Sequence, residues 1–203
     1  MKPIYALLKT VFPSATWNLS TGKKNIYLTF DDGPLPGITP FVLETLKQYN
    51  AKATFFCVGE NVQRNEDLFR RVIEEGHAAG NHTFSHLNGW KTSTPAYLAD
   101  VEACRKLVPS ALFRPPYGKL RPAQYKALMK KYRIVMWNVL SRDYDSNVSA
   151  ERCLENVIEN AGNGSIIVFH DNYKSEKSLR YVLPRVLEHF SGKGFGFGKI
   201  KGE

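Results

Sequence analysis

Cysteine is scarce in this chain of 203 residues, and the three that occur, Cys57, Cys104 and Cys153, stand far apart with no C-x-x-C pair. An odd number of widely spaced cysteines indicates neither a disulfide framework nor a zinc knuckle, so we expect all three to be small core residues. Internal repeats and low-complexity segments are also lacking. With 43% hydrophobic and 23% charged residues, the chain has the composition of one domain with a sizeable core.

The first twelve residues lack an uninterrupted apolar run, because Lys2, Pro3 and Lys9 separate the apolar side chains. A cleavable signal peptide needs about 7 to 15 consecutive apolar residues and a membrane span about 20, so we predict neither. The apolar positions have helical spacing, which predicts an amphipathic segment within residues 1–24, either packed on the domain as a lid or lying on a membrane surface. We therefore expect a location in the cytoplasm or at the cytoplasmic face of the membrane.

A nucleic-acid-binding motif is also lacking, although the net charge is +9, from 28 Lys and Arg against 19 Asp and Glu. The basic residues are scattered along the chain, so we predict no nucleic-acid partner. The excess of positive charge either serves solubility alone or favours anionic partners such as acidic glycans, lipid phosphates or a bilayer surface.

Two adjacent carboxylates are the most informative feature that is present. Asp31 and Asp32 stand in the turn T-F-D-D-G-P, residues 29–34, directly after the apolar run 26–30. Because adjacent carboxylates repel each other, we expect a metal ion or an arginine to neutralise one of them, which leaves the other available for proton transfer. The alternative is a solvated Asp-Asp-Gly-Pro turn.

A pair of histidines follows downstream, at His82 and His86 in the sequence G-N-H-T-F-S-H. Their four-residue spacing places both imidazoles on one side of a helical turn, and imidazole nitrogens together with carboxylate oxygens are the ligands of catalytic zinc-type sites. Surface or capping histidines are the alternative. Combined with the aspartate pair, the histidines predict a metal site of two histidines and one carboxylate.

Strands and helices are predicted to alternate along the chain. The predicted strands are residues 25–30, 53–58, 78–81, 111–113, 134–139, 165–169 and, more weakly, 195–200. The predicted helices are residues 40–49, 61–75, 94–107, 122–132, 150–160 and 175–190. This α/β alternation favours a parallel sheet. Five strands carry a polar motif at their C-terminal end, which favours a barrel over an open sheet, because all loops at that end of a barrel converge on one mouth.

Three of these polar motifs remain to be named: F-R-P-P-Y-G at residues 113–118, M-W-N-V-L-S-R-D-Y-D at 136–145 and I-I-V-F-H-D at 166–171. Together with the aspartate and histidine pairs, they resemble, in order, the five motifs of the polysaccharide deacetylases, carbohydrate esterase family 4, whose domain is the NodB homology domain. The resemblance covers residues 25–203, which we predict to be the catalytic domain. It implies a distorted, incomplete (β/α) barrel of about seven strands.

The resemblance also implies a metal centre. It assigns Asp32, His82 and His86 as ligands of a divalent metal, which would lower the pKa of a bound water to about 7 and polarise the acetyl carbonyl. It assigns Asp31 as the base that takes the proton of that water. Arg114 resembles the partner that keeps Asp31 ionised and oriented through a bidentate contact, with a surface salt bridge as the alternative.

The leaving group and the oxyanion have candidates of their own. His170 resembles the general acid for the departing amine, and Asp143 resembles the residue that holds this histidine protonated; a core histidine bonded to backbone is the alternative for His170. The backbone N–H of Tyr117 resembles the second donor to the oxyanion, in a loop that Pro115 and Pro116 would stiffen.

Five residues are expected to bind the substrate: Pro116, Tyr117, Trp137, Tyr144 and Val168. Trp137 and Tyr144 would offer flat aromatic faces to a sugar ring, or else belong to the core. Tyr144 stands where the family commonly has tryptophan, and Val168 stands where a leucine often lines the acetyl pocket. These departures bear on which sugar and acyl group are accepted.

The predicted function is a metal-dependent hydrolase that removes N-acetyl groups from N-acetylhexosamine units of a glycan, of chitooligosaccharide or peptidoglycan type, and releases acetate. Zinc is the metal we expect first, although cobalt, nickel, manganese or iron would suit the same nitrogen and oxygen ligands. One alternative is a deformylase or imidase-like C–N hydrolase with a small or lipid-linked substrate. Another is a glycan-binding module without turnover.

Overall fold

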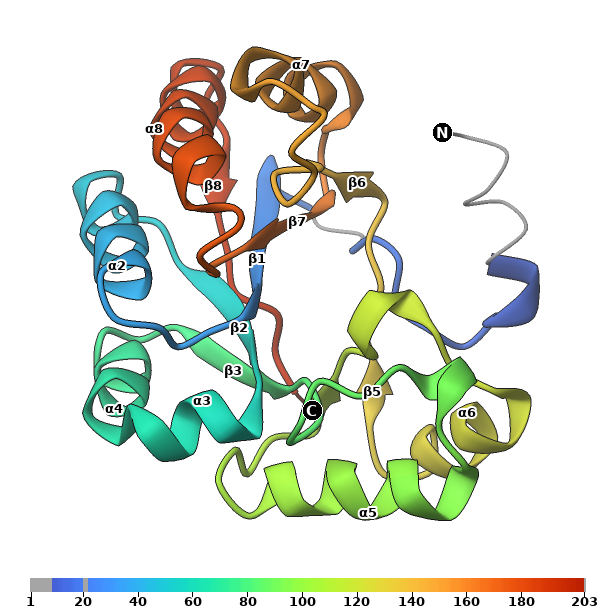
Figure 1. Cartoon of the computed structure of the whole chain (residues 1–203). Helices are drawn as coiled ribbons and strands as arrows, with labels where there is room; N and C mark the ends of the chain where they lie inside the picture. Colours follow the sequence, from blue (N-terminus) through green and yellow to red (C-terminus); the bar gives the residue numbers. More distant parts are fainter. Residues whose placement is uncertain (1–8, 20–21, 203) are drawn as a thin grey trace.

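Parallel pairing of strands dominates the fold. The structure is a computed structural model, and it describes residues 9–19 and 22–202. Seven strands form an open curl in the order β5-β4-β3-β2-β1-β7-β6, and β8 pairs with β1 (Figure 1). This arrangement confirms the predicted distorted, incomplete barrel of about seven strands. The strands are β1 (Asn25–Asp32), β2 (Ala53–Cys57), β3 (Ala78–Asn81), β4 (Leu112–Phe113), β5 (Arg133–Ile134), β6 (Val139–Leu140), β7 (Ile166–His170) and β8 (Gly196–Phe197).

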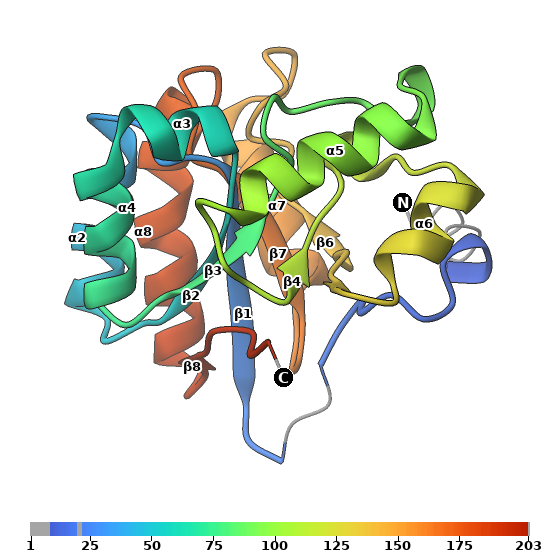
Figure 2. The same cartoon turned by 90° about the horizontal axis from the view of Figure 1, so that it is seen from below.

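Helices surround the curled sheet on its outer side. Seen from below, α2, α4 and α8 lie to one side of β1, and α5 and α6 lie towards the other side (Figure 2). The helices are α2 (Ile38–Gln48), α3 (Gly59–Arg64), α4 (Glu66–Glu74), α5 (Thr94–Arg105), α6 (Pro122–Leu128), α7 (Ala150–Asn160) and α8 (Glu176–Gly192), with short 3₁₀ turns η1 (Gly89–Lys91) and η2 (Pro116–Gly118).

The two-residue period of β1 separates the outer core from the interior of the barrel. Ile26, Leu28 and Phe30 are fully buried against the surrounding helices. Tyr27 belongs instead to an interior cluster, and strand geometry points residues 29 and 31 to the same side as Tyr27. A polar side chain at position 31 is therefore directed into the barrel, at the C-terminal end of the strand.

The predicted strand 134–139 is wrong, because the structure has two short strands there. β5 lies at one edge of the sheet and β6 at the other, so residues 135–138 cross from edge to edge. Thr16 pairs with Val135 in this crossing: its N–H donates to the carbonyl of Ile134, and its carbonyl accepts from the N–H of Met136. The barrel stays incomplete because β5 and β6 do not pair with each other.

The predicted helix 61–75 is also divided, into α3 and α4, at Asn65. The φ of −137° and ψ of 51° at Asn65 are not helical. Its side-chain amide donates to the carbonyls of Pro34 and Asn61, at 3.2 and 3.0 Å. Asparagine side chains compete in this way with the helical backbone, and here the bond to Pro34 ties the break to the turn after β1.

The described part of the N-terminal segment packs along the open side of the barrel, on α6. Phe12 is 3% exposed, and its ring centroid lies 4.9 Å from that of Tyr125. The N–H of Ser14 donates to the Tyr125 hydroxyl at 3.0 Å. The predicted amphipathic helix falls mainly on residues 1–8, which lie outside the described residues. Among the helices of residues 9–19 and 22–202, none is long and apolar enough to cross a membrane.

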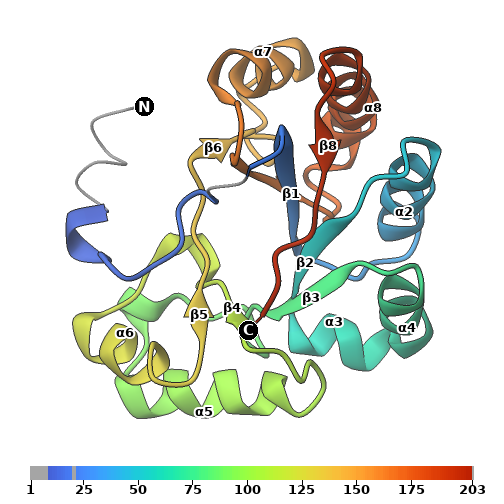
Figure 3. The same cartoon turned by 180° about the vertical axis from the view of Figure 1, so that it is seen from behind.

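The C-terminal segment covers the opposite end of the barrel from the strand ends that carry the motifs (Figure 3). Ile200 is 1% exposed and packs in the interior cluster with Tyr27 and Phe56. Its backbone N–H donates to the Thr54 hydroxyl at 2.9 Å. Since this end is filled by apolar side chains, only the end at the C-termini of the strands is available for a polar site.

Replacing Phe12 by alanine should lower the free energy of unfolding by about 3 to 5 kcal/mol, because a buried aromatic ring would leave a cavity against Tyr125. Urea unfolding measures this change. The matched control is Val11→Ala, since Val11 is 50% exposed and its truncation should stay within about 0.5 kcal/mol. Equal effects of the two substitutions would show that residues 9–19 do not pack on α6.

Candidate active site

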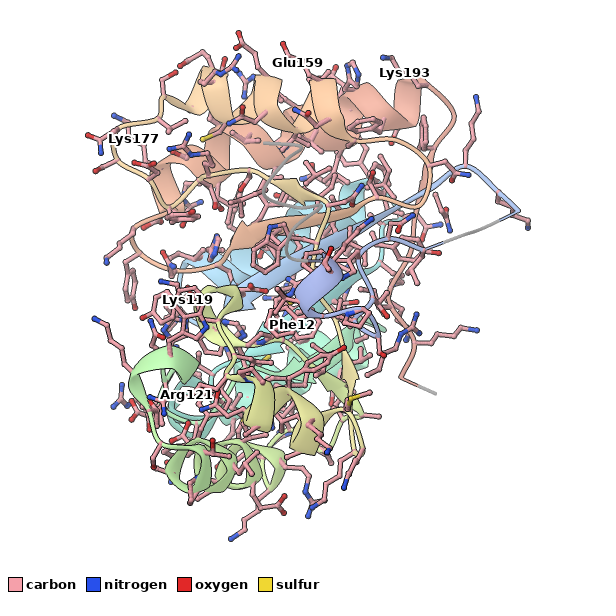
Figure 4. All side chains as sticks on the ribbon, turned by 90° about the vertical axis from the view of Figure 1, so that its right-hand side faces the viewer. Phe12, Lys119, Arg121, Glu159, Lys177 and Lys193 are labelled. Carbon is pink, nitrogen blue, oxygen red and sulfur yellow. The ribbon has the colours of Figure 1, made fainter. Side chains whose placement is uncertain are left out.

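A cavity of about 680 Å³ opens at the C-terminal ends of the strands. Figure 4 shows this end of the molecule on the left, where Lys119 of the cavity lies, as does Lys177 at the start of α8; Lys193, after the end of α8, lies at the far end. The predicted metal-site and catalytic side chains that line the cavity are Asp31, Asp32, His82, His86 and His170. Motifs separated by up to 139 positions in the sequence thus meet at one mouth.

Asp31 is 4% exposed at the end of β1 and is bound by a fully buried arginine. Nη1 of Arg114 lies 2.7 Å from Oδ1 of Asp31 and also donates to the Thr29 hydroxyl at 2.7 Å. The expected bidentate contact is wrong: Nε and Nη2 donate instead to the backbone carbonyls of Val135 and Met136. The guanidinium gives only one nitrogen to Asp31, because its other two nitrogens donate to the carbonyls of the segment that crosses between β5 and β6.

The burial of Arg114 is supported by aromatic packing as well as by hydrogen bonds. Its guanidinium carbon lies 4.1 Å from the ring centroid of Phe56 and 5.7 Å from that of Trp137. A buried cation without such partners is costly. Removing Asp31 would take away the carboxylate that pairs with this buried guanidinium. The surface salt bridge that we considered for this arginine is therefore excluded.

Asp32, His82 and His86 form a cluster whose ligand atoms all lie within 4.8 Å of one another. Oδ1 of Asp32 lies 3.1 Å from Nε2 of His86 and 3.7 Å from Nε2 of His82. Within the described residues, this buried oxygen has no aligned hydrogen-bond donor. A buried carboxylate oxygen left without a donor, and facing two imidazole nitrogens, fits the donor set of a divalent metal.

The hydrogen bonding of His82 fixes its tautomer. Nδ1 of His82 lies 2.7 Å from the carbonyl oxygen of Arg114, which can only accept, so Nδ1 carries the proton. Burial lowers the pKa of His82 to about 4, and the imidazole is neutral at pH 7. Its Nε2 therefore presents a lone pair towards Asp32, as a metal ligand requires.

The charge of Asp32 is also compatible with a ligand role. Burial by itself would raise the pKa of Asp32, but the His86 imidazole beside it and the positive charge of His170 outweigh burial and hold this pKa well below its usual range. The carboxylate is consequently ionised at neutral pH. Ionised carboxylate and neutral imidazole are the forms in which these residues bind metals.

The loop that carries the two histidines is held from behind by α5. Asp100 accepts hydrogen bonds from the backbone N–H groups of residues 84–85, at 2.8 and 3.0 Å. Thr83 and His86 both have positive φ, 64° and 54°, and the Thr83 hydroxyl accepts from the N–H of Leu87 at 3.1 Å. These bonds offset the strain of a left-handed backbone, so His86 is positioned by its loop and not by a helix as its spacing indicated.

His170 pairs with Asp143 beside this cluster. Nδ1 of His170 lies 2.8 Å from Oδ1 of Asp143, and the His170 backbone N–H donates to Oδ2 at 2.8 Å. The Ser141 hydroxyl donates to the same carboxylate at 2.9 Å. Burial would lower the pKa of His170, but the charge and hydrogen bond of Asp143 raise it to about 9. His170 is thus a cation at neutral pH, and its ring is bonded to a carboxylate, not to backbone as in the alternative that we considered.

The predicted substrate-binding residues differ in their placement. Tyr117, Trp137, Tyr144 and Val168 line the cavity, whereas Pro116 is buried and does not. Tyr117 is 58% exposed, with its ring 4.7 Å from that of His86, and Tyr144 is 43% exposed, with its ring 4.9 Å from that of His170. Trp137 lines the cavity and also packs against the core clusters, so its placement is compatible with either interpretation.

Two site residues were assigned no role from the sequence, although one of them, Asp171, ends the motif of residues 166–171. Asn172 donates its side-chain amide to Oδ2 of Asp32 at 2.6 Å, which orients the carboxylate. Asp171 is fully buried, accepts from the Thr39 hydroxyl at 2.6 Å and from the Gly33 N–H at 2.9 Å, and burial raises its pKa to about 7. A Cβ at Gly33 would lie 1.9 Å from this carboxylate. Asp171 and Asn172 are the two residues after His170 in the sequence, and this proximity was the available signal.

The pairing of His170 with Asp143 gives a prediction for the metal-free protein, prepared with a chelator. NMR titration of His170 should give a pKa of about 9, and Asp143→Asn should bring that pKa towards or below the ordinary 6.5. Because the folded-state pKa is raised, the stability that the pair contributes is complete below pH 6.5 and is lost as pH rises through 9.

Asp145→Asn is the matched control for this titration. Asp145 is two residues away but pairs with Arg142 at 2.6 Å, so its change should leave the pKa of His170 in place. An equal shift of that pKa in both variants would contradict a specific role for Asp143.

Known proteins resemble this chain in sequence and in fold. The family model for polysaccharide deacetylase matches residues 18–137. A peptidoglycan-N-acetylglucosamine deacetylase of Bacillus cereus is 35% identical over 189 residues, which cover 90% of this chain and 89% of the relative. A chitooligosaccharide deacetylase of Azorhizobium caulinodans is 31% identical over 189 residues, covering 82% of this chain and 90% of the relative.

Longer relatives and a solved structure match as well. The peptidoglycan-N-acetylglucosamine deacetylase PgdA of Listeria monocytogenes is 34% identical over 87% of this chain, which spans only 38% of that protein. A crystal structure of a peptidoglycan N-acetylglucosamine deacetylase in complex with 4-naphthalen-1-yl-N-oxidanyl-benzamide superposes with a TM-score of 0.83 at 32% identity, covering 92% of this chain and 91% of that one. The chain therefore belongs to the polysaccharide deacetylase family.

Proposed function

We propose that this protein is a metal-dependent deacetylase that removes N-acetyl groups from N-acetylglucosamine units of a peptidoglycan-type or chitooligosaccharide-type glycan. Family membership supports deacetylation of a polysaccharide, and the names of the Bacillus and Azorhizobium relatives support these two substrate types. The observation that carries the proposal is the meeting of the Asp32, His82 and His86 cluster with the Asp31–Arg114 and His170–Asp143 pairs at one cavity.

Asp32, His82 and His86 would hold the metal ion, since they combine an ionised carboxylate with imidazole nitrogens. A divalent cation supplies Lewis-acid polarisation of the acetyl carbonyl and makes water acidic enough to act as a nucleophile near neutral pH. Zinc suits this set of three protein ligands best; cobalt, nickel, manganese and iron accept the same donor types.

Asp31 is the proposed general base. Its Oδ1 is bound by Arg114, and its neighbour in the sequence belongs to the metal cluster, so its carboxylate lies at the cavity where water would attack. The Arg114 guanidinium holds the carboxylate in one orientation, which keeps it aimed at the cavity. Asp31 would take one proton from the attacking water as the new carbon–oxygen bond forms.

His170 is the proposed general acid. Breaking the carbon–nitrogen bond releases an amine, which needs a proton as it leaves, and His170 carries one at neutral pH because of Asp143. Nδ1 is engaged by Asp143, so the proton would be donated from Nε2. One water is consumed, acetate and a free amine are released, and the base and acid return to their starting forms by exchange with solvent.

The remaining cavity residues have binding roles in this proposal. The backbone N–H of Tyr117 would donate to the oxyanion that forms on the carbonyl. Val168 faces the cavity from β7 and would contact the acetyl methyl group, while the aromatic rings of Trp137 and Tyr144 would contact the sugar.

Two substitutions separate metal binding from proton transfer. Asp31→Asn should retain the metal but lower kcat by about 10² to 10⁴, the usual effect of losing a general base. His82→Ala should lose both metal and acetate release, because it removes a ligand. The measurements are elemental analysis of the purified proteins and acetate release from chitooligosaccharides and peptidoglycan fragments, with folding checked by circular dichroism.

Two results would contradict the proposal. The first is an Asp31→Asn protein without metal beside a His82→Ala protein that keeps it, which would reverse the assigned roles. The second is acetate release from both glycans at less than a hundredth of the rate of formate release from a formylated sugar lipid. That outcome would favour the deformylase alternative.

A further inference from the structure

Two lysines flank the mouth of the cavity and have no assigned role. Lys119 follows η2, after β4, and Lys174 follows β7; both line the cavity. In the sheet, β4 and β7 are separated by β3, β2 and β1, so the two lysines lie on different sides of the mouth. Neither lysine forms a salt bridge with any residue of 9–19 or 22–202. Two lysines without a carboxylate partner among the described residues therefore face any chain that crosses the cavity.

The carboxylates of the cavity do not neutralise these lysines. Asp31 is bound by Arg114, and Asp32 is bound by Asn172 and faces the two metal-site histidines. A bound divalent cation would make the mouth still more positive. The local field therefore favours a substrate that carries negative charge close to the reacting group.

Trp90 extends the surface beyond Lys119. Its indole is 56% exposed, yet Nε1 donates to the carbonyl of Leu120 at 3.1 Å, and its own carbonyl accepts from Arg121 at 2.8 Å. Lys119 Nζ lies 5.0 Å from the centre of the Trp90 ring. An exposed aromatic ring held in one orientation offers a preformed stacking face, which suits the apolar face of a sugar ring.

We propose that Lys119, Trp90 and Lys174 form a subsite that makes the enzyme selective for acidic glycans, in which a sugar next to the reacting N-acetylglucosamine carries a carboxylate. This inference rests on the proposed function and names its substrate more narrowly. Trp90 would stack on a sugar beyond the cavity on one side, while the ammonium of Lys119 pairs with the carboxylate of that sugar. Lys174 serves a carboxylate on the other side of the cavity.

Carboxylate is favoured over phosphate by the residues at the subsite. The two lysines are single point charges on different sides of the mouth, and the cavity lining formed by residues 9–19 and 22–202 has no guanidinium fork or helix N-terminus to clamp a tetrahedral dianion. Among the described residues that line the cavity, these two are the only lysines, and no arginine is present. Single carboxylates spaced along a glycan match this distribution.

The test compares two substrates that differ only in charge. The first is a tetrasaccharide that alternates N-acetylglucosamine with N-acetylmuramic acid, and the second is the same tetrasaccharide with its carboxylates converted to methyl esters. For the metal-loaded enzyme, KM should be lower for the acidic form, and the ratio of the two KM values should approach one as salt is raised. Each exposed ion pair contributes about 0.2 to 1 kcal/mol, so each lysine should account for roughly a 1.4- to 5-fold part of that ratio.

The variants Lys119→Gln and Lys174→Gln should each reduce the ratio of the two KM values, and the double variant should bring this ratio to one. Any change in kcat should be the same for both substrates. Trp90→Ala should raise KM for both forms, because stacking does not depend on charge. The matched control is Lys193→Gln, at the opposite end of the molecule (Figure 4), which should keep the parent ratio. An unchanged preference in the double variant, or equal KM values in the parent, would overturn the inference.

Binding measurements keep this test independent of turnover. Calorimetric titration of Asp31→Asn with the same two tetrasaccharides should show tighter binding of the acidic form, and Lys119→Gln with Lys174→Gln in that background should remove the difference. Binding that favours the acidic form without any acetate release by the parent would support the subsite and contradict the proposed function. Acetate release with equal binding of both forms would support the function and overturn the subsite.

Discussion

Crowding of negative charge is the constraint around which the site is organised. Four carboxylates, Asp31, Asp32, Asp143 and Asp171, lie at the C-terminal ends of neighbouring strands or in the loops that follow, and three of them are almost fully buried. Buried like charges repel and lose hydration, so each one needs its own compensation. Asp31 has Arg114, Asp143 has a protonated histidine, and Asp171 has a raised pKa with two donors. Only Asp32 keeps a buried oxygen without an aligned donor in the described chain.

The fold brings these groups together because parallel strands end at the same edge. The β1–β7 register places Asp31 beside His170, and the strand period directs Asp31 into the barrel while Phe30 packs against the helices. Arg114 then links the site to the barrel wall, because its remaining nitrogens satisfy the carbonyls of the segment that crosses between β5 and β6. The Arg114 side chain thus holds both the Asp31 carboxylate and the segment that crosses the open side of the barrel.

Much of this arrangement could be predicted from the sequence, because strand-and-helix alternation and polar motifs after apolar runs are local signals. The residue types predicted a metal site of two histidines and one carboxylate, and the family resemblance assigned Asp32 as that carboxylate. The break at Asn65 and the crossing at residues 135–138 could not be, because each depends on bonds to distant residues, Pro34 in one case and Thr16 in the other. Asn172 was missed for the same reason, since its role depends on Asp32, 140 positions away.

The account depends on a cation beside Oδ1 of Asp32, the oxygen of these four carboxylates that has no aligned donor in the described chain. Anomalous X-ray diffraction at the zinc absorption edge, from crystals grown with one equivalent of zinc, tests this directly. We expect a single strong peak bounded by the Asp32 carboxylate and the Nε2 atoms of His82 and His86. A peak elsewhere with this position empty, or three side chains turned away from one another around no peak, would contradict the account.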